Sequence, residues 1–526
     1  MENNRFTVFE IVYYAYFALM LTAKGIGLYV GQWPYTAAVC LSFVLIFVKV
    51  ITTEHSWQEL LAIIALVILG GEIYIHSNEI GALIIISVVI GMKNVSVKRL
   101  MMLGTVIWTV TFVLSTILTL TGIRGDIFKS QNKLGLGYIM RYSLGQPHPN
   151  VLQISYMLLC VFILYVSHVK GRKLLVTTAI MMVGNIYFFI YSISYTGIVL
   201  STLYLMFNYY MSARENVPLN RAEKTVCSII VPGAALFSIL GPNFLTGKVW
   251  DICNKLLNTR FYITREYMSI NPISLFGTGY CNELPGDLNN LDCSYVFALM
   301  HYGVIFFVLF LAGYIGLISY FIKKNKRIEL AITLSLCIAA ISEPFFVNTS
   351  FKNITYIFLG EFLYAVMAKI PGTKCIRTRL TEIGNKQIII PLDRIDNAVK
   401  KAVDKCSKYA VKIAISAVVV GTVAAVLYAV IKDVPAAYYL NRDTVQTENG
   451  EHGFNMDINN LPEDFDGVIL QYTDADTMMM RLDGNAVKVD YIRGIISMFL
   501  WCGLFTSLIV GIGIVYANSD ARKLEN

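Results

Sequence analysis

Hydrophobic residues in this chain gather into long runs separated by short polar stretches. A helix needs about 20 mostly apolar residues to span a hydrocarbon core of roughly 30 Å. The fourth run is short and the first contains Glu10. The pattern predicts an all-α polytopic membrane protein with about 14 transmembrane helices. The runs fall near residues 7–23, 35–51, 57–75, 79–92, 99–120, 151–168, 174–193, 197–213, 225–245, 294–321, 329–346, 354–369, 409–431 and 491–517.

Composition agrees with this pattern. Hydrophobic residues make up 56% of the chain, charged residues are held to 15%, and the mean hydropathy is +0.59. These values lie outside the range of ordinary soluble globular proteins. The first apolar run lacks a basic leader and a small-residue cleavage site, so we expect no removable signal peptide.

The Lys and Arg residues between the runs predict the orientation, because cytoplasmic loops collect them. With the amino terminus inside, 28 of the 43 Lys and Arg residues fall on the cytoplasmic side and 15 outside. An even number of helices then places both termini in the cytoplasm. The net charge of +8 is attributed to this topology and to anionic lipid, with no nucleic-acid partner.

Three parts are predicted. Residues 1–369 form a twelve-helix core with two long extracytoplasmic loops, 121–150 and 246–293. Residues 370–408 form a basic cytoplasmic linker, amphipathic near its end. Residues 409–526 form a helix, an outer segment and a second helix. The outer segment, residues 432–490, carries 12 Asp and Glu against 4 Lys and Arg, which predicts a small acidic extracytoplasmic domain.

Positive charge in the two outer loops of the core runs against this topology, since outer loops usually lose Lys and Arg. Their retention predicts an anionic ligand at the outer face. Guanidinium groups suit a phosphate or diphosphate, because they bond its oxygens bidentately and stay charged. The cations are Arg124, Lys129, Lys133 and Arg141 in the first loop, and Lys248, Lys255, Arg260 and Arg265 in the second.

The stretch "RYSLGQPHPN", residues 141–150, opens one of the helices. A transferase that uses a lipid diphosphate must neutralise the departing diphosphate and activate an acceptor hydroxyl. Arg141, Arg260 and Arg265 are suited to the first task, and the His148 imidazole to the second. Asn150 is a good cap for the helix that follows. The alternative is that His148 is an interfacial residue and the arginines snorkel to lipid headgroups.

Carboxylates also lie on the outer side. Asp292 fits either a catalytic role or the N-cap of the next helix. Glu343 falls inside an apolar run, where a charge is expensive and usually serves function or a specific partner. Cys281 and Cys293 allow a disulfide, although an odd number of outer cysteines leaves this open. The segment "NMDINNLPEDFD", residues 455–466, lacks the Gly and Glu of a calcium loop.

Four stretches together resemble a known family. They are "RYSLGQPHPN", "LNTRFYITREYMSINPISLFGTG", "DCSYVFALMHYGVIFFVLFLAGY" and "SEPFFVNTSFKN", in this order. Over residues 1–369 the chain resembles the Wzy-type O-antigen, capsular and exopolysaccharide repeat-unit polymerases, which are O-antigen-ligase-like membrane glycosyltransferases.

The resemblance implies an enzyme of the bacterial cytoplasmic membrane. Such an enzyme transfers a growing glycan from undecaprenyl diphosphate to the non-reducing end of a new lipid-linked repeat unit, at the outer face and without metal or cofactor. A flippase and a chain-length co-polymerase are implied as further partners. The expected catalytic residues are His148, Asp292 and Glu343. The expected diphosphate- or substrate-binding residues are Arg141, Asn150, Arg260, Arg265 and Tyr295.

Two departures from the family pattern stand out. Many relatives place an Arg where this chain has Tyr195, which leaves one phosphate contact unassigned. The helix pair from residue 409 onward lies outside the usual family plan, and an assembly module is one interpretation of it. The alternative functions are a ligase that passes glycan to another acceptor and a flippase of lipid-linked oligosaccharide. A receptor or scaffold would explain the acidic segment and leave the arginines without a role.

Overall fold

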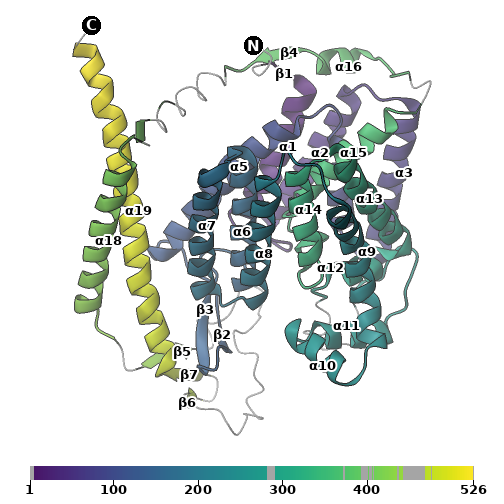
Figure 1. The fold of residues 1–526 in the computed structure, drawn as a ribbon. Coiled ribbons are helices and arrows are strands. Elements are labelled where there is room, and N and C mark those ends of the chain that lie inside the picture. The colour runs from purple at the N-terminus through teal and green to yellow at the C-terminus, as the bar shows by residue number, and fades with distance from the viewer. Residues whose placement is uncertain are drawn as a thin grey trace.

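The computed structural model describes residues 5–280, 291–370, 374–391, 401, 405–406, 408–434, 437–441, 468–474 and 477–524. Its helices form an elongated bundle with most long loops collected at one end (Figure 1). We call that end the loop face. It carries strands β2 (Phe128–Asn132) and β3 (Tyr138–Tyr142) and helices α10 (Gly247–Leu256) and α11 (Arg260–Ile270). The opposite end, where the first helix begins, is the N-terminal face.

Nine helices in the described part of the chain are long and apolar enough to cross a membrane. The chain is therefore a helical membrane protein. Every one of the fourteen apolar runs overlaps a helix, while the total of fourteen crossings stays a prediction. The nine are α2 (Trp33–Thr52), α3 (Trp57–Ser77), α5 (Val97–Leu120), α6 (Pro149–Ser167), α7 (Gly171–Ser192), α9 (Arg221–Phe244), α13 (Gly303–Lys324), α18 (Ala410–Ile431) and α19 (Asn485–Leu524).

The other helices of the bundle are shorter or carry more polar residues. Helix α4 covers only 11 residues of an apolar run. Helix α14 ends at Ala339, before the end of the apolar run 329–346. They are α1 (Val8–Gly25), α4 (Gly81–Gly91), α8 (Tyr195–Ala213), α12 (Ser294–His301), α14 (Arg327–Ala339) and α15 (Thr355–Met367), with one 3₁₀ turn, η3 (Pro344–Phe346).

The run 294–321, expected as one helix, is two helices that meet at Gly303. Gly303 has φ +81°, and a Cβ atom there would lie 2.3 Å from the Leu275 carbonyl oxygen. Backbone bonds from the segment before residue 280 satisfy the groups freed at this break: Val304 N donates to Ser274 O, and Thr278 N to Met300 O. Irregular backbone at membrane depth needs such partners, and hydropathy alone does not reveal them.

Three cations at the N-terminal face form ion pairs, whereas the buried Lys49 ammonium donates to the Thr53 hydroxyl and the Lys93 carbonyl. Glu10, the charge inside the first run, accepts from Arg99 at 3.3 Å, and Lys93 pairs with Glu59. The Arg327 guanidinium bonds both oxygens of the Glu223 carboxylate at 3.1 Å. The same face carries the antiparallel pair β1 (Arg5–Thr7) and β4 (Gln387–Ile389) and the short helix α16 (Arg379–Gly384). Each of the three paired cations, Arg99, Lys93 and Arg327, therefore has a local countercharge.

The outer segment between the last two helices contains a three-stranded antiparallel sheet of order β5–β7–β6. Its strands are β5 (Ala437–Asn441), β6 (Val468–Asp474) and β7 (Thr477–Asp483). The stretch 455–466 and most of the amphipathic linker lie outside the described residues, as does Cys281 of the predicted disulfide.

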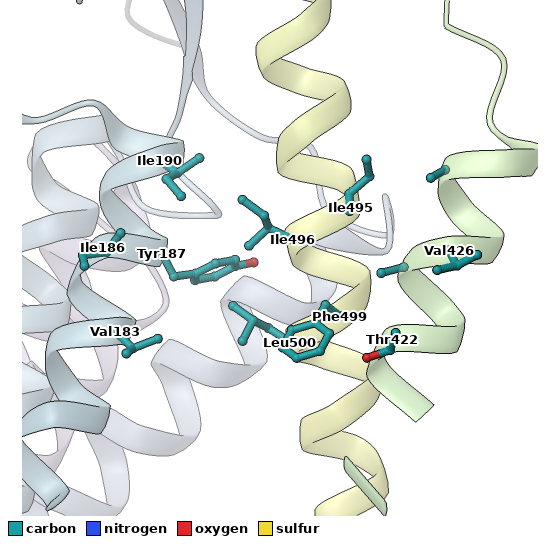
Figure 2. Close-up of a pocket in the computed structure, with 12 residues that line it drawn as sticks. Val183, Ile186, Tyr187, Ile190, Thr422, Val426, Ile495, Ile496, Phe499 and Leu500 are labelled. Carbon is teal, nitrogen blue, oxygen red and sulfur yellow. The ribbon is translucent and has the colours of Figure 1, made fainter. Parts of the chain in front are cut away.

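Helix α19 attaches the C-terminal pair to the bundle through polar contacts with α7 and β3. The Arg493 Nε donates to the Ile190 carbonyl at 2.8 Å, and the Tyr142 hydroxyl donates to Asp490 at 2.8 Å. Farther from the loop face than these contacts, α7, α18 and α19 line an apolar cleft of about 540 Å³. Figure 2 shows side chains of α7 and α18 facing each other across α19. In a bilayer, lipid hydrocarbon would fill this cleft.

Candidate functional site

The hairpin β2–β3 fixes Arg141, which pairs across the sheet with Lys129. All three guanidinium nitrogens of Arg141 have partners. Its Nε donates to the Ser192 carbonyl at 2.7 Å, and its two terminal nitrogens donate to Gln131 Oε1 and Asn150 Oδ1 at 2.6 Å each. A guanidinium has five N–H groups, so these three bonds leave two donors. The Arg141 side chain is rigidly held, buried and still able to bind an anion.

His148 and Asn150 form the start of helix α6. The His148 Nδ1 accepts from the Asn150 backbone N–H at 3.1 Å and acts as the N-cap, followed by Pro149 at the first helical position. Because Nδ1 is an acceptor, the neutral ring carries its proton on Nε2. Sequence reasoning assigned the cap to Asn150. Instead, His148 caps the helix and Asn150 orients Arg141.

Burial, together with the positive charges of Lys129, Arg141 and Arg260, lowers the pKa of His148 to about 3. The ring is therefore neutral at physiological pH. A neutral ring with Nδ1 engaged offers an Nε2–H donor, so the geometry favours hydrogen-bond donation over proton abstraction.

Arg260 begins helix α11 and joins two carboxylates. Its Nη2 lies 2.9 Å from Asp292 Oδ2 and 3.7 Å from Glu343 Oε1. Its Nε donates to the Ser342 carbonyl at 2.6 Å, and Glu343 also accepts from the Thr196 hydroxyl at 2.8 Å. The Asp292 side chain is 38% exposed, against 7% for Glu343. Asp292 is thus the carboxylate that a substrate can reach.

Partial desolvation raises the pKa of Asp292, and the nearby Arg260 opposes that shift. A raised pKa makes this carboxylate a better proton acceptor at neutral pH than an ordinary surface aspartate. Asp292 precedes the helix α12 N-cap, which is Cys293 and makes no side-chain capping bond. The N-cap interpretation of Asp292 is therefore wrong.

The two halves of this arrangement come from loops more than a hundred residues apart. Glu343 lies within electrostatic range of Arg141 as well as Arg260. Burial lowers the pKa of Lys133, and the positive charges of Arg141 and Arg260 also lower it. We call these residues, Lys133, Arg141, His148, Arg260, Asp292 and Glu343, the loop-face cluster. Three of its members are cations, two are acidic and His148 is neutral, so its formal net charge with both carboxyl groups ionised is +1.

Arg265 and Tyr295 lie elsewhere. The Arg265 Nε donates to the Pro242 carbonyl at 2.7 Å, and its guanidinium lies 4.8 Å from the Trp250 ring, where it secures the end of helix α9. The Tyr295 side chain is fully buried, and its hydroxyl donates to the Cys337 carbonyl at 2.9 Å. The structure assigns both residues packing contacts in place of positions in the cluster.

Several residues of the site had no sequence signal. Gln131 and Thr196 orient charged members from positions that look like ordinary loop and helix residues. Tyr195 accepts from the Leu134 backbone N–H at 2.9 Å, and the Lys133 ammonium lies 5.3 Å from its ring. A cation from the hairpin therefore stands beside the position where the family pattern expects arginine. Only the paired strands, which the sequence analysis did not predict, bring it there.

No family model, curated protein or solved structure matches this chain. The class of the protein therefore rests on its own geometry: a helical membrane protein with a partly buried, net-positive cluster at one face.

Proposed function

We propose that the chain is a membrane glycosyltransferase that polymerises glycan repeat units carried on undecaprenyl diphosphate. The loop face would be the outer face of a bacterial cytoplasmic membrane, with about fourteen crossings and both termini inside. The observation that carries the proposal is the net positive charge of the loop-face cluster. Its donors are held by backbone carbonyls and amides, which suits a diphosphate that arrives with the substrate.

In this proposal each charged group has a separate task. Arg141, with two unused N–H groups, and the His148 Nε2–H bind oxygens of the departing diphosphate. Lys133 supplies the further positive charge that the Tyr195 substitution removes. Asp292 accepts the proton of the attacking sugar hydroxyl, and Arg260 fixes its orientation while Glu343 balances the charge. These assignments replace His148 as the general base.

The test uses a bacterial strain that lacks the gene and is complemented with variants. His148→Ala should insert normally and leave single repeat units on the lipid carrier, because the departing diphosphate loses a donor. His168→Ala is the matched control: His168 lies at the opposite end of the same helix and is half exposed. Long glycan in the His148→Ala strain at the wild-type level would refute the site. Arg260→Ala is unsuitable, because it leaves Asp292 and Glu343 without their countercharge.

A flippase of lipid-linked oligosaccharide is the second candidate. Discontinuous helices are frequent in secondary transporters, and the break at Gly303 and the early end of α14 at Ala339 are of this kind. The location of the lipid-linked units separates the two functions. A flippase variant traps them on the cytoplasmic leaflet, whereas a polymerase variant accumulates single units on the outer leaflet. A ligase variant keeps long glycan on the carrier.

A further inference from the structure

Two lysines in the interior of the bundle have no countercharge. Lys24 and Lys352 are 7% and 5% exposed. The Lys24 ammonium donates to the Leu28 carbonyl at 3.2 Å and lies 3.7 Å from the centroid of the Tyr35 ring. The Lys352 ammonium has only the Trp108 ring, at 5.9 Å. Within the described residues, neither lysine has a carboxylate within ion-pair distance. An ammonium without a partner is costly at such a depth.

The backbone on either side of Lys352 is strained or rigidly held. Phe351, directly before it, has φ +55°, a conformation that is unfavourable for a bulky side chain. The Asn353 amide on the other side donates to the Tyr314 hydroxyl at 3.0 Å and to the Phe346 carbonyl at 2.9 Å. Strained backbone with rigid flanks is typical of functional positions. The ammonium is thus fixed at one place in the bundle.

The two ammonium groups lie within electrostatic range of each other, and Lys352 is also within range of Glu343 in the loop-face cluster. Like charges repel strongly where water is scarce. An anion between them would remove both the repulsion and the cost of their burial. The pair therefore has a physical reason to bind an anion.

A chain of hydrogen bonds leads from the Trp108 ring, beside Lys352, to Gln146 in the stretch 141–150. The Trp108 indole beside Lys352 donates to the Ser155 carbonyl at 2.9 Å, and the Ser155 hydroxyl donates to Gln146 Oε1 at 3.1 Å. The Gln146 Nε2 is itself buried, with no acceptor among the described residues. A buried donor without an acceptor also favours a bound anion.

We propose that Lys24 and Lys352 form a second oxyanion subsite, separate from the loop-face cluster, for a phosphate or carboxylate group. The identity of the substrate as a glycan lipid rests on the proposed function, whereas the anionic character of the ligand rests on the two lysines alone. With this subsite the protein would bind a substrate with two separated negative groups: a diphosphate at the cluster and a second oxyanion at the lysine pair.

The binding test measures the number of anions bound by the purified full-length protein in detergent. Inorganic phosphate is one probe and glucuronate the other, so that the phosphate and carboxylate sources are distinguished. We expect the wild type to bind two phosphates, or one phosphate and one glucuronate, and Lys352→Met to lose one of them. Lys352→Arg should keep both, with affinity changed less than about tenfold, since a cation remains.

A stability measurement separates binding from a structural role. Without added anion, Lys352→Met should raise the midpoint of thermal unfolding, because it removes a buried unpaired charge from a side chain of similar shape. Added phosphate should then stabilise the variant less than the wild type. Lys93→Met is the matched control. It should lower the midpoint, because it leaves Glu59 buried without its partner.

Unchanged anion stoichiometry for both probes in Lys352→Met would overturn the subsite, and so would a lower midpoint together with full stabilisation by phosphate. Failure of the polymerase proposal would look different. In that case Lys352→Met would lose an anion in the binding experiment while the cellular glycan of all strains kept its normal length.

Discussion

The two faces of this protein differ in how some of their buried cations are held, although the loop face also has an ion pair, between Arg260 and Asp292. At the N-terminal face, Arg99, Lys93 and Arg327 each contact a glutamate. At the loop face, Arg141 is held by a carbonyl and two amide side chains. In the bundle interior, Lys352 lies 5.9 Å from the Trp108 ring and has no carboxylate partner among the described residues. Paired charges support a fold at little net electrostatic cost, whereas unpaired ones oppose it. The difference indicates that the ion pairs of the N-terminal face stabilise the fold, whereas Arg141 and Lys352 are suited to binding an anion.

The largest effect on folding is expected at the N-terminal face. Arg327 is fully buried and forms a bidentate pair with Glu223. Arg327→Met should destabilise the protein by up to about 3 kcal/mol, because it removes the bidentate partner of the Glu223 carboxylate and leaves Arg214, 3.7 Å away, as its cation. Denaturant unfolding in detergent measures this. The double variant Arg327→Met, Glu223→Met should recover much of the loss. If the single variant is as stable as the wild type, the pair has no structural role.

The largest effect on function is expected at the loop face. Arg141→Met should reduce polymer synthesis roughly a hundredfold, the usual order of magnitude for loss of one oriented donor to a developing charge. Its unfolding free energy should change less than that of Arg327→Met, since Gln131 and Asn150 are neutral and can turn toward other partners. If Arg141→Met loses as much unfolding free energy as Arg327→Met and shows no defect in polymer synthesis beyond that loss, the two faces do not differ in function.

His148 gives a smaller effect that depends on pH. Its pKa is about 3 in the folded protein and about 6.5 when unfolded. Folding therefore favours the neutral ring. This contribution is fully present above pH 6.5 and is lost progressively as the pH falls toward 3. His148→Gln should therefore lose less stability than the wild type between pH 6.5 and 4, as thermal unfolding would show. Parallel curves would mean that His148 is not buried in a positive environment.

The same pKa bears on catalysis. Because His148 stays neutral throughout, the rate of polymer synthesis should show no His148 titration between pH 5 and 8. A rate that falls with an apparent pKa near 6.5 in the wild type, but not in His148→Gln, would restore His148 as the general base.

The smallest effect is expected at the partly exposed pair Lys326–Glu361, also at the N-terminal face, with 27% and 33% of the side chains exposed. Exposed pairs contribute about 0–1 kcal/mol. Lys326→Met should therefore change the unfolding free energy by less than about 1 kcal/mol, in the same denaturant assay. A loss as large as that of Arg327→Met would show that pairing at this face matters irrespective of burial.

The sequence predicted the helical membrane class and the position of nine candidate spans among the described residues, because apolar length is a local property, while the total of fourteen stays a prediction. It failed where tertiary partners replace local ones. Gly303 breaks a run that looks continuous, since backbone groups of Ser274 and Thr278 satisfy the exposed ends. The hairpin β2–β3 has no strong alternation and forms in a loop at the loop face.

The candidate site was predicted in part. Charge in the loops identified Arg141, Arg260 and Asp292, the 141–150 stretch identified His148, and a carboxylate inside an apolar run identified Glu343. The fold brings these residues into one region. Arg265 carried the same signal, yet it bonds the Pro242 carbonyl, because a guanidinium serves a helix end as well as a phosphate. Lys24 and Lys352 were overlooked as site residues, since a single lysine near a helix end resembles a topology signal until its burial is known.

The most direct test of the central claim is reconstitution of the purified protein in liposomes with undecaprenyl-diphosphate-linked repeat units, followed by measurement of product length. The wild type should produce long glycan on the carrier, and Arg141→Met should leave single units although it inserts and folds. Failure of the wild type to lengthen the glycan, or equal products from both proteins, would contradict the claim that the unpaired charge at the loop face serves glycan polymerisation.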